Sequence, residues 1–329
     1  EFSQGIPAGE GEQHPKSSAR CPAAPENVYL AIDVAGTWRS TNSGRSWMKS
    51  ADRGMYVQNL QSICVDPLDP DIAFVVAAPF GGRSNIFGQF AGVYRTEDGG
   101  DNWSQVLQRY VPYGHGRYRR IDRNLVVPRP LTPGETKASV WYAAIDTQGI
   151  FMSDDAGISW EPYWARNPEK LYYTLTVVPD AATGDDVLYV GSLGGLRRYA
   201  RGESGVTCTP LHVPKTYSAP ARPKHGGGIS SVQVIPANTD IASAEGMWVV
   251  RKHDKAYFTS SLIPTSAAQW IEAELHGKDG THWTRPGTTE NNWPTTHFAR
   301  LVYVHPTNPS NAYLVTGRDF FYLDWTDRK

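Results

Sequence analysis

Short runs of alternating apolar and polar residues recur along the chain, and Gly, Pro, Asp or Asn bound each run. The segments LQSICV (60–65) and AFVVAA (73–78) are typical, because both favour strands and they flank the turn DPLDPD (66–71). A period of two residues over four to eight positions predicts strands. Similar strand pairs recur to the end of the chain, as in RLVYVHPTNPSNAYLVTG (300–317). The pattern predicts an all-β protein built from many short antiparallel strands.

Three turns between these strands share one pattern, Ser/Thr-x-Asp/Asn-x-Gly-x-x-Trp. They read STNSGRSW (40–47), TEDGGDNW (96–103) and SDDAGISW (153–160), and we call them the Trp turns. Successive Trp residues are 56 and 57 positions apart. A constant spacing near 50 residues is typical of β-propeller blades, each a four-stranded sheet.

The residue choice within each Trp turn has a physical reason. Asp or Asn accepts hydrogen bonds from the backbone of the turn. Gly allows a positive φ where the chain reverses, and the Trp ring buries a large area between neighbouring sheets. We therefore predict that the Trp turns are structural and that each closes a blade.

The Trp turns resemble the Asp-box, or BNR, repeat of sialidases, sortilin-type receptors and family 74 glycoside hydrolases. The resemblance implies a single β-propeller of four-stranded antiparallel blades with Asp-box turns. About six repeating units are found in the sequence, so six or seven blades are expected. Residues 1–26, which are poor in apolar side chains, are predicted to be a flexible leader, and 27–329 to be the propeller domain.

Composition narrows the classes of partner. Lys and Arg number 32 and Asp and Glu 33, so the net charge of −1 gives no reason to expect a nucleic-acid partner. No apolar run approaches the roughly 18 residues of a membrane span. We expect a monomer that is secreted or periplasmic.

Cysteines and histidines give no metal or cofactor signature. The three cysteines lack a CxxC pair, and the histidines lack a spacing such as HExxH, so neither a metal nor a cofactor is expected. Cys64 lies in a strand pattern and is predicted to be a buried thiol, whereas Cys21 and Cys208 would allow a disulfide.

The strand order predicts which end of the blades carries function. If the strands of one unit are A to D, the A–B and C–D turns lie at one end, and the B–C turns and D-to-A linkers lie at the other, the B–C end. The Trp turns are C–D turns. The long irregular segments fall at the B–C end, and such loops commonly carry binding and catalysis. They are 79–92, 108–122, 212–229 and 273–297.

Two B–C turns match each other and each carries an Asp. YLAIDVAG (29–36) contains Asp33, and YAAIDTQG (142–149) contains Asp146. Paired carboxylates at one end of the blades can act as acid and base in glycosidic cleavage. The alternative is that both side chains cap their own turns, and the sequence leaves both roles open.

The surroundings of Asp33 carry a second resemblance. VYLAIDVAGTWRS is similar to the first-blade motif Tyr-x-x-x-Asp-Val-x-Gly-x-x-Arg of family 74 xyloglucan-active enzymes. The resemblance implies that Asp33 is a catalytic carboxylate. Those enzymes take the second acid from a second propeller, whereas this sequence accounts for one propeller. The matching residues are Tyr29, Asp33, Val34, Gly36 and Arg39.

Other candidate residues also fall at the B–C end. In segment 108–122, Tyr113 and His115 would shuttle a proton while Arg117 and Arg119 bind a carboxylate, which is the chemistry of a uronate-specific lyase. In segment 273–297, Trp283 and Trp293 would stack on sugar rings. Two further substrate-binding candidates at B–C junctions are His253 and Arg318.

The sequence therefore favours a carbohydrate-active enzyme that cleaves glycosidic bonds of a plant-type or microbial polysaccharide, with Asp33 as a catalytic carboxylate. A uronate-specific lyase based on residues 113–120 is the first alternative. A non-catalytic propeller that binds carbohydrate or protein is the second. A sialidase is disfavoured because no Arg-Ile-Pro motif is present.

Overall fold

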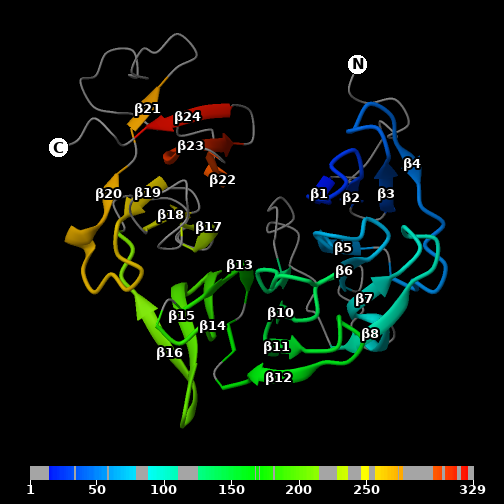
Figure 1. Cartoon of the computed structure of the whole chain (residues 1–329), viewed down its shortest axis with the longest axis horizontal. Helices are drawn as coiled ribbons and strands as arrows, with labels where there is room; N and C mark the ends of the chain where they lie inside the picture. Colours follow the sequence, from blue (N-terminus) through cyan, green and yellow to red (C-terminus); the bar gives the residue numbers. More distant parts are fainter. Residues whose placement is uncertain are drawn as a thin grey trace. The chain divides into compact units, whose positions relative to one another are not determined.

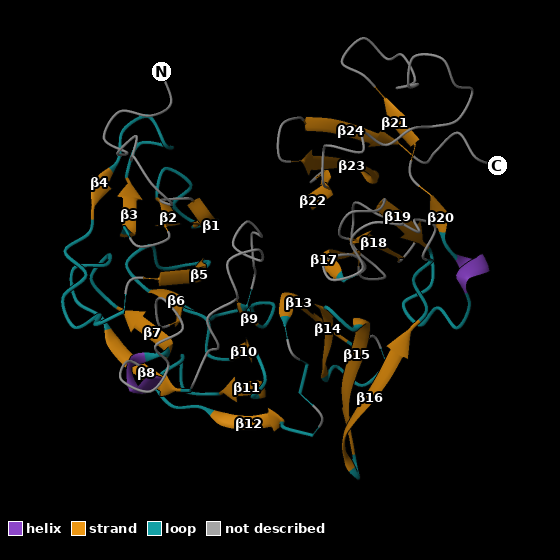
Figure 2. Cartoon of the chain, turned by 180° about the vertical axis from the view of Figure 1, so that it is seen from behind, coloured by secondary structure: helices purple, strands orange, loops and turns teal. Residues whose placement is uncertain are grey.

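The computed structural model shows a chain whose regular structure is almost entirely β-strand (Figure 2). Two 3-10 turns are present in the described part of the chain, η1 (Gly88–Phe90) and η2 (Ala267–Gln269). The residues that the structure describes are 15–32, 35–57, 59–78, 88–109, 125–166, 168–169, 171–180, 182–214, 228–235, 246–251, 256–272, 274–276, 299–305, 308–316 and 320–324.

The first twenty strands form five four-stranded sheets in which consecutive strands are neighbours (Figure 1). This is the up-and-down order of propeller blades. The first three sheets are β1 (Pro15–Arg20), β2 (Val28–Ile32), β3 (Gly36–Ser40) and β4 (Met48–Lys49); β5 (Asn59–Val65), β6 (Ala73–Ala78), β7 (Gly92–Thr96) and β8 (Ser104–Gln108); and β9 (Val126–Pro128), β10 (Trp141–Ile145), β11 (Gly149–Ser153) and β12 (Glu161–Trp164). The other two are β13 (Tyr172–Pro179), β14 (Asp186–Ser192), β15 (Gly195–Gly202) and β16 (Gly205–Leu211); and β17 (Ile229–Ile235), β18 (Gly246–Arg251), β19 (Ala256–Thr259) and β20 (Ile271–Glu272).

The last four described strands form a sheet with a different order. β21 (Glu274–His276) pairs with β24 (Phe320–Asp324), and the sheet continues through β23 (Asn308–Thr316) to β22 (Ala299–His305). The edge strand therefore precedes its sheet in sequence. The expectation of six or seven consecutive blades is wrong, because only five described sheets have that order. The three residues of β21 lie inside segment 273–297, which had been predicted to be an irregular loop.

The segment predicted to be a leader contains a strand. β1 pairs antiparallel with β2, and its Ser17 hydroxyl donates to the Ile63 carbonyl oxygen at 3.5 Å. Lys16 and Cys21 are buried. The prediction of a flexible leader is therefore wrong from residue 15 onward. The reason is that PKSSAR pairs through its backbone and carries no apolar alternation to reveal it.

The chain divides into two compact units, 1–175 and 176–329, which we describe separately. In the first unit, β6 and β10 are buried along their whole length. Its core includes Leu60, Val75, Tyr94 and Trp103. The core of the second unit gathers apolar residues of β14, β17 and β18.

No helix in the described ranges is long and apolar enough to cross a membrane.

All three cysteines are free thiols, so the Cys21–Cys208 disulfide that the sequence would allow is not formed. Cys21 is buried, whereas Cys64 and Cys208 are half-buried. Burial raises the pKa of the Cys64 thiol to about 12, and the nearby Asp66 carboxylate acts in the same direction. Cys64 is therefore protonated and a poor nucleophile near neutral pH.

Each Trp turn joins the third and fourth strands of its sheet and has the same internal hydrogen bonds. In the second turn, the Thr96 hydroxyl donates to Asp98 Oδ1 at 2.9 Å and accepts the Gly100 N–H at 3.0 Å. Trp103 Nε1 donates to the Gly100 carbonyl oxygen at 3.0 Å. Equivalent bonds form at 40–47 and 153–160. The conserved spacing of the motif thus reflects one shared turn geometry.

The third Trp turn also packs on the preceding sheet. In the third turn, the Ala156 carbonyl oxygen accepts a hydrogen bond from Arg95 Nε at 2.9 Å, and the Trp160 ring lies 6.3 Å from that of Phe74. Gly157 has a φ of +82°, and a Cβ there would collide with the Phe74 ring. Glycine at this position therefore serves both the turn and the contact between sheets.

The acid strength of Asp155 in the third turn gives a testable consequence. Partial burial raises the pKa of this carboxyl, but hydrogen bonds from Ser159, Ser153 and Ile158 outweigh it and lower the pKa from 3.8 to about 2. Because the folded-state pKa is depressed, the ionised carboxylate stabilises the fold above pH 3.8. That contribution is lost as the pH falls toward about 2.

We expect Asp155→Asn to retain stability at neutral pH and to lose part of the acid sensitivity. Asn42 already occupies this position in the first turn and accepts the equivalent bonds. Asp155→Ala should lose about 0.5–1.5 kcal/mol at neutral pH, the usual net contribution of hydrogen bonds whose donors water can otherwise satisfy. Urea unfolding at neutral pH and at about pH 3 measures the stability of both variants and its dependence on pH. An Asn variant as acid-sensitive as the wild type would show that Asp155 does not contribute.

Candidate functional site

The strand registers of the first unit place its turns at two opposite ends. In the second sheet, Asn59 pairs with Ala78 and Gly92 pairs with Gln108, so these four positions share one end. In the third sheet, Ile145 pairs with Gly149 at the corresponding B–C turn. The Ala138 N–H donates to Asp66 Oδ2 at 2.8 Å between the A–B connections, which aligns the two sheets. The Trp turns therefore lie at the opposite end from Asp146.

Asp146 follows β10 directly and is buried, with 1% of its surface exposed. Its Oδ1 accepts the Tyr172 N–H at 2.7 Å. The neighbouring Thr147 N–H donates to the Glu169 carbonyl oxygen at 2.8 Å, and the Glu169 N–H donates to the Tyr172 hydroxyl at 3.0 Å. The B–C turn of the third sheet is thus bonded to the linker that leads into β13.

These contacts favour a structural role for Asp146. The carboxylate accepts a hydrogen bond from the first residue of the next strand, a contact that the sequence did not predict. Burial and a backbone partner do not by themselves define an acid or base, so the catalytic role of Asp146 stays a prediction. The effect of substitutions at Asp146 on the free energy of unfolding tests the structural role.

We expect Asp146→Ala to destabilise the first unit by about 1–3 kcal/mol, because a buried N–H of Tyr172 loses its acceptor. Asp146→Asn is the matched control, since its amide oxygen can still accept that bond. Thermal and urea unfolding measure the difference. If Ala and Asn variants unfold at the same denaturant concentration as the wild type, the bond to Tyr172 does not stabilise the fold.

Asp33 lies outside the described residues, but the strands on both sides of it are described. β2 ends at Ile32, and β3 begins at Gly36, so Asp33 belongs to the B–C turn of the first sheet. This turn occupies the same place in its sheet as Asp146 does in the third. The catalytic role of Asp33 is a proposal below.

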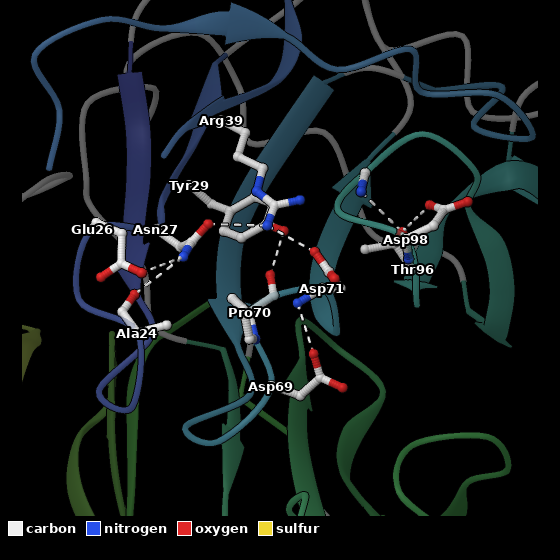
Figure 3. A network of polar contacts seen from close by, with 11 residues as sticks. Ala24, Glu26, Asn27, Tyr29, Arg39, Asp69, Pro70, Asp71, Thr96 and Asp98 are labelled. Carbon is white, nitrogen blue, oxygen red and sulfur yellow. Dashed lines mark hydrogen bonds and ion pairs between the residues drawn. The ribbon is translucent and has the colours of Figure 1, made fainter. Parts of the chain in front are cut away.

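Two residues of the family-like motif around Asp33 have structural contacts at the opposite end. The Tyr29 hydroxyl donates to the Pro70 carbonyl oxygen at 2.6 Å, and Arg39 NH2 lies 2.7 Å from Asp71 Oδ1 (Figure 3). Arg39 NH2 also donates to Asn27 Oδ1 at 3.0 Å, and the guanidinium lies 5.3 Å from the centroid of the Tyr29 ring. These contacts join the first two sheets, so this part of the motif has a packing explanation.

Asp52 is bonded to the start of β3, and its role was not predicted from the sequence. The residue is 4% exposed and has a φ of +51°, which is unusual for a residue other than Gly. Its Oδ2 accepts the Thr37 N–H at 3.1 Å, and its carboxylate also binds the Thr37 hydroxyl and Lys49 Nζ. A Cβ at Gly36 would collide with Oδ2. The carboxylate thus fixes the start of β3 directly after the turn.

The remaining predicted site residues lie outside the described residues. In the described ranges, no group of three or more His, Cys, Asp or Glu side chains could hold a metal ion. The structure therefore neither brings together nor separates the other predicted side chains. They are Tyr113, His115, Arg117, Arg119, His253, Trp283, Trp293 and Arg318.

Comparisons with known proteins find no matching family model and no matching curated protein. Solved structures do match. The GH74 enzyme of Niastella koreensis and the GH74 xyloglucanase of Xanthomonas campestris each have a TM-score of 0.58 over 94% of this chain, at 15% and 17% identity. YCF48 bound to the D1 peptide matches 96% of this chain and 79% of its own, with a TM-score of 0.50 and 13% identity.

At these identities the likeness shows the fold, which is a β-propeller of four-stranded antiparallel blades. The chain spans 44% of the length of each of the two GH74 enzymes. The neighbours include glycoside hydrolases and a propeller that binds a peptide, so the fold by itself does not select between cleavage and binding.

Proposed function

We propose that this propeller acts on a polysaccharide at the B–C end of its blades, cleaving glycosidic bonds with Asp33 as a catalytic carboxylate. The observation that carries the proposal is the first-blade motif at Tyr29–Arg39, found on a fold shared with two GH74 enzymes. Within this motif, the described contacts explain Tyr29 and Arg39 by packing. Asp33 is the acidic residue of the motif at the B–C end.

A local support for this proposal is the way in which Asp52 holds the start of β3, three residues after Asp33 in the sequence. Gly36 lacks the Cβ that would collide with Asp52, and the Asp52 carboxylate accepts the Thr37 N–H. A catalytic carboxylate needs a rigid support to hold its geometry. The second acid is not assigned here, because the contacts of Asp146 favour a structural role.

A non-catalytic binding propeller is the second candidate function. It is favoured by the burial of Asp146 and by its bond to the Tyr172 N–H, which give this carboxylate a structural explanation. The likeness to YCF48 bound to a peptide agrees with this candidate. An extracellular location and a monomeric state fit both functions and belong to the proposal.

Incubation with a panel of polysaccharides separates the candidates. Reducing ends and the ultraviolet absorbance of unsaturated sugars are followed together. A hydrolase produces new reducing ends alone, whereas a lyase produces both signals. A chain that produces neither signal with any polysaccharide, yet is retained by one of them, is a binding propeller, and the cleavage proposal is then wrong.

A further inference from the structure

An exposed pair of aromatic rings lies at the B–C end of the second sheet. Tyr56 is 71% exposed, although its neighbours Met55 and Val57 are each only 6% exposed. The centroid of its ring lies 5.0 Å from that of the half-buried Phe90, and the two planes are inclined by 40°. The chain thus turns one large aromatic side chain outward between two core residues.

A buried side chain of β7 fixes the backbone beside one of the two rings. Tyr94 has no exposed surface, and its hydroxyl donates to the Phe90 carbonyl oxygen at 2.6 Å. This bond holds the end of η1 against the sheet.

A second side chain fixes the loop on each side of Phe90. Gln105 Nε2, from β8, donates to the carbonyl oxygens of Gln89 and Ala91, at 3.0 Å in each case. The conformation of η1 is thus set by side chains of the sheet below it. An aromatic surface that is ordered before a ligand arrives loses less entropy on binding.

The pair occupies the end of the blade where we place the proposed function. Tyr56 precedes β5 in the linker from the first sheet, and Phe90 precedes β7 in the B–C loop. The linker runs from the second Trp turn, where Arg53 bridges Asn102, toward the B–C end, where Asn59 pairs with Ala78, and the ring contact places Phe90 beside it. The Trp turn at 96–103 lies at the other end of the same sheet.

The chemistry of this surface fits a sugar ring. A pyranose has an apolar face of C–H groups and a rim of hydroxyls, so it can stack on an aromatic ring while polar groups take its hydroxyls. Next to the pair, Gln89 is exposed and supplies an amide. We propose that Tyr56 and Phe90 form a stacking subsite for one sugar ring of the polysaccharide. This inference rests on the proposed function.

Affinity gel electrophoresis tests the subsite, with xyloglucan, mixed-linkage glucan, xylan or polygalacturonate cast into native gels. The wild type should be retarded by at least one of them. Tyr56→Ala should bind that polysaccharide about tenfold or more weakly, as expected for truncation of a contact residue worth over 1 kcal/mol. Tyr56→Trp keeps an aromatic face and should remain retarded.

Ile158→Ala is the matched control, because Ile158 is 57% exposed and lies in a Trp turn at the opposite end of its sheet. Its retardation should equal that of the wild type, and circular dichroism should show that all variants are folded. Full retardation of Tyr56→Ala would overturn the subsite while leaving the proposed function intact. A wild type that none of the four polysaccharides retards would overturn both proposals.

Discussion

Replacing Trp103 by Ala is expected to destabilise the first unit by about 3–5 kcal/mol, the usual cost of truncating a buried aromatic side chain. Trp103 is 4% exposed and belongs to the core with Met55 and Val57. Its backbone N–H donates to the Arg53 carbonyl oxygen at 2.7 Å, so the ring lies where the second sheet meets the linker from the first. Removing the ring opens a cavity at this junction.

Trp47→Ala provides the matched comparison, because Trp47 closes the first Trp turn but is only half-buried. Its loss of stability should be clearly smaller than that of Trp103→Ala, since less area is buried. Urea unfolding of both variants measures the difference. The polysaccharide affinity of the folded Trp47→Ala protein should be unchanged. A stable variant that had lost binding would place the function at the Trp turns.

Asp33→Asn is expected to reduce turnover on the cleaved polysaccharide by on the order of 100-fold or more, the usual scale of acid–base assistance. The amide has the size of the carboxylate, but it cannot transfer the proton. The melting temperature and the affinity for the polysaccharide should therefore barely change. Initial rates of reducing-end formation, with affinity measured on the same polysaccharide, provide the test.

Variants of the alternative loop serve as the comparison for Asp33→Asn. If Asp33→Asn remains fully active while changes at Tyr113, His115 or Arg119 abolish product, the lyase proposal replaces the hydrolase proposal. Asp146→Asn should retain most of its activity if this carboxylate only supports the Tyr172 backbone. A loss as large as that of Asp33→Asn would restore Asp146 as the second acid.

Much of the fold could be predicted because its signals are local. The hydrogen bonds that give the three Trp turns their shared shape form within eight residues, so the motif predicts both these bonds and the place between two strands. The strands of the central sheets are similarly visible, because β6 and β10 are apolar along their whole length. Local chemistry of this kind requires no knowledge of distant contacts.

The strands that were not predicted from the sequence, β1 and β21, depend on backbone pairing with other strands, which leaves no pattern in their own residues. β1 is polar and joins its sheet through backbone bonds to β2. β21 has three residues and completes a sheet whose other strands begin at residue 299. The consecutive order therefore held for five sheets, and the blade count failed where an edge strand came from earlier in the chain.

The candidate site was predictable in position but not in contacts. Asp146 lies at the expected turn, yet its partner Tyr172 is 26 residues away. Asp52 reaches back 15 residues to Thr37, and Tyr56 meets Phe90 across a whole strand pair. Two features of the sequence could have pointed to these residues. Tyr56 is an aromatic residue between Met55 and Val57 in a linker, and Asp52 stands two positions before a Gly in ADRGM (51–55).

Hydrogen–deuterium exchange of the wild-type chain, with and without a polysaccharide that retards it, tests most directly whether function lies at the B–C end. The account predicts that the ligand slows exchange of backbone amides at 35–37, 55–57, 88–91 and 147–149. Exchange in the Trp turns at 96–103 and 153–160 should be unchanged. Protection confined to those turns, with none at the B–C end, would contradict the account.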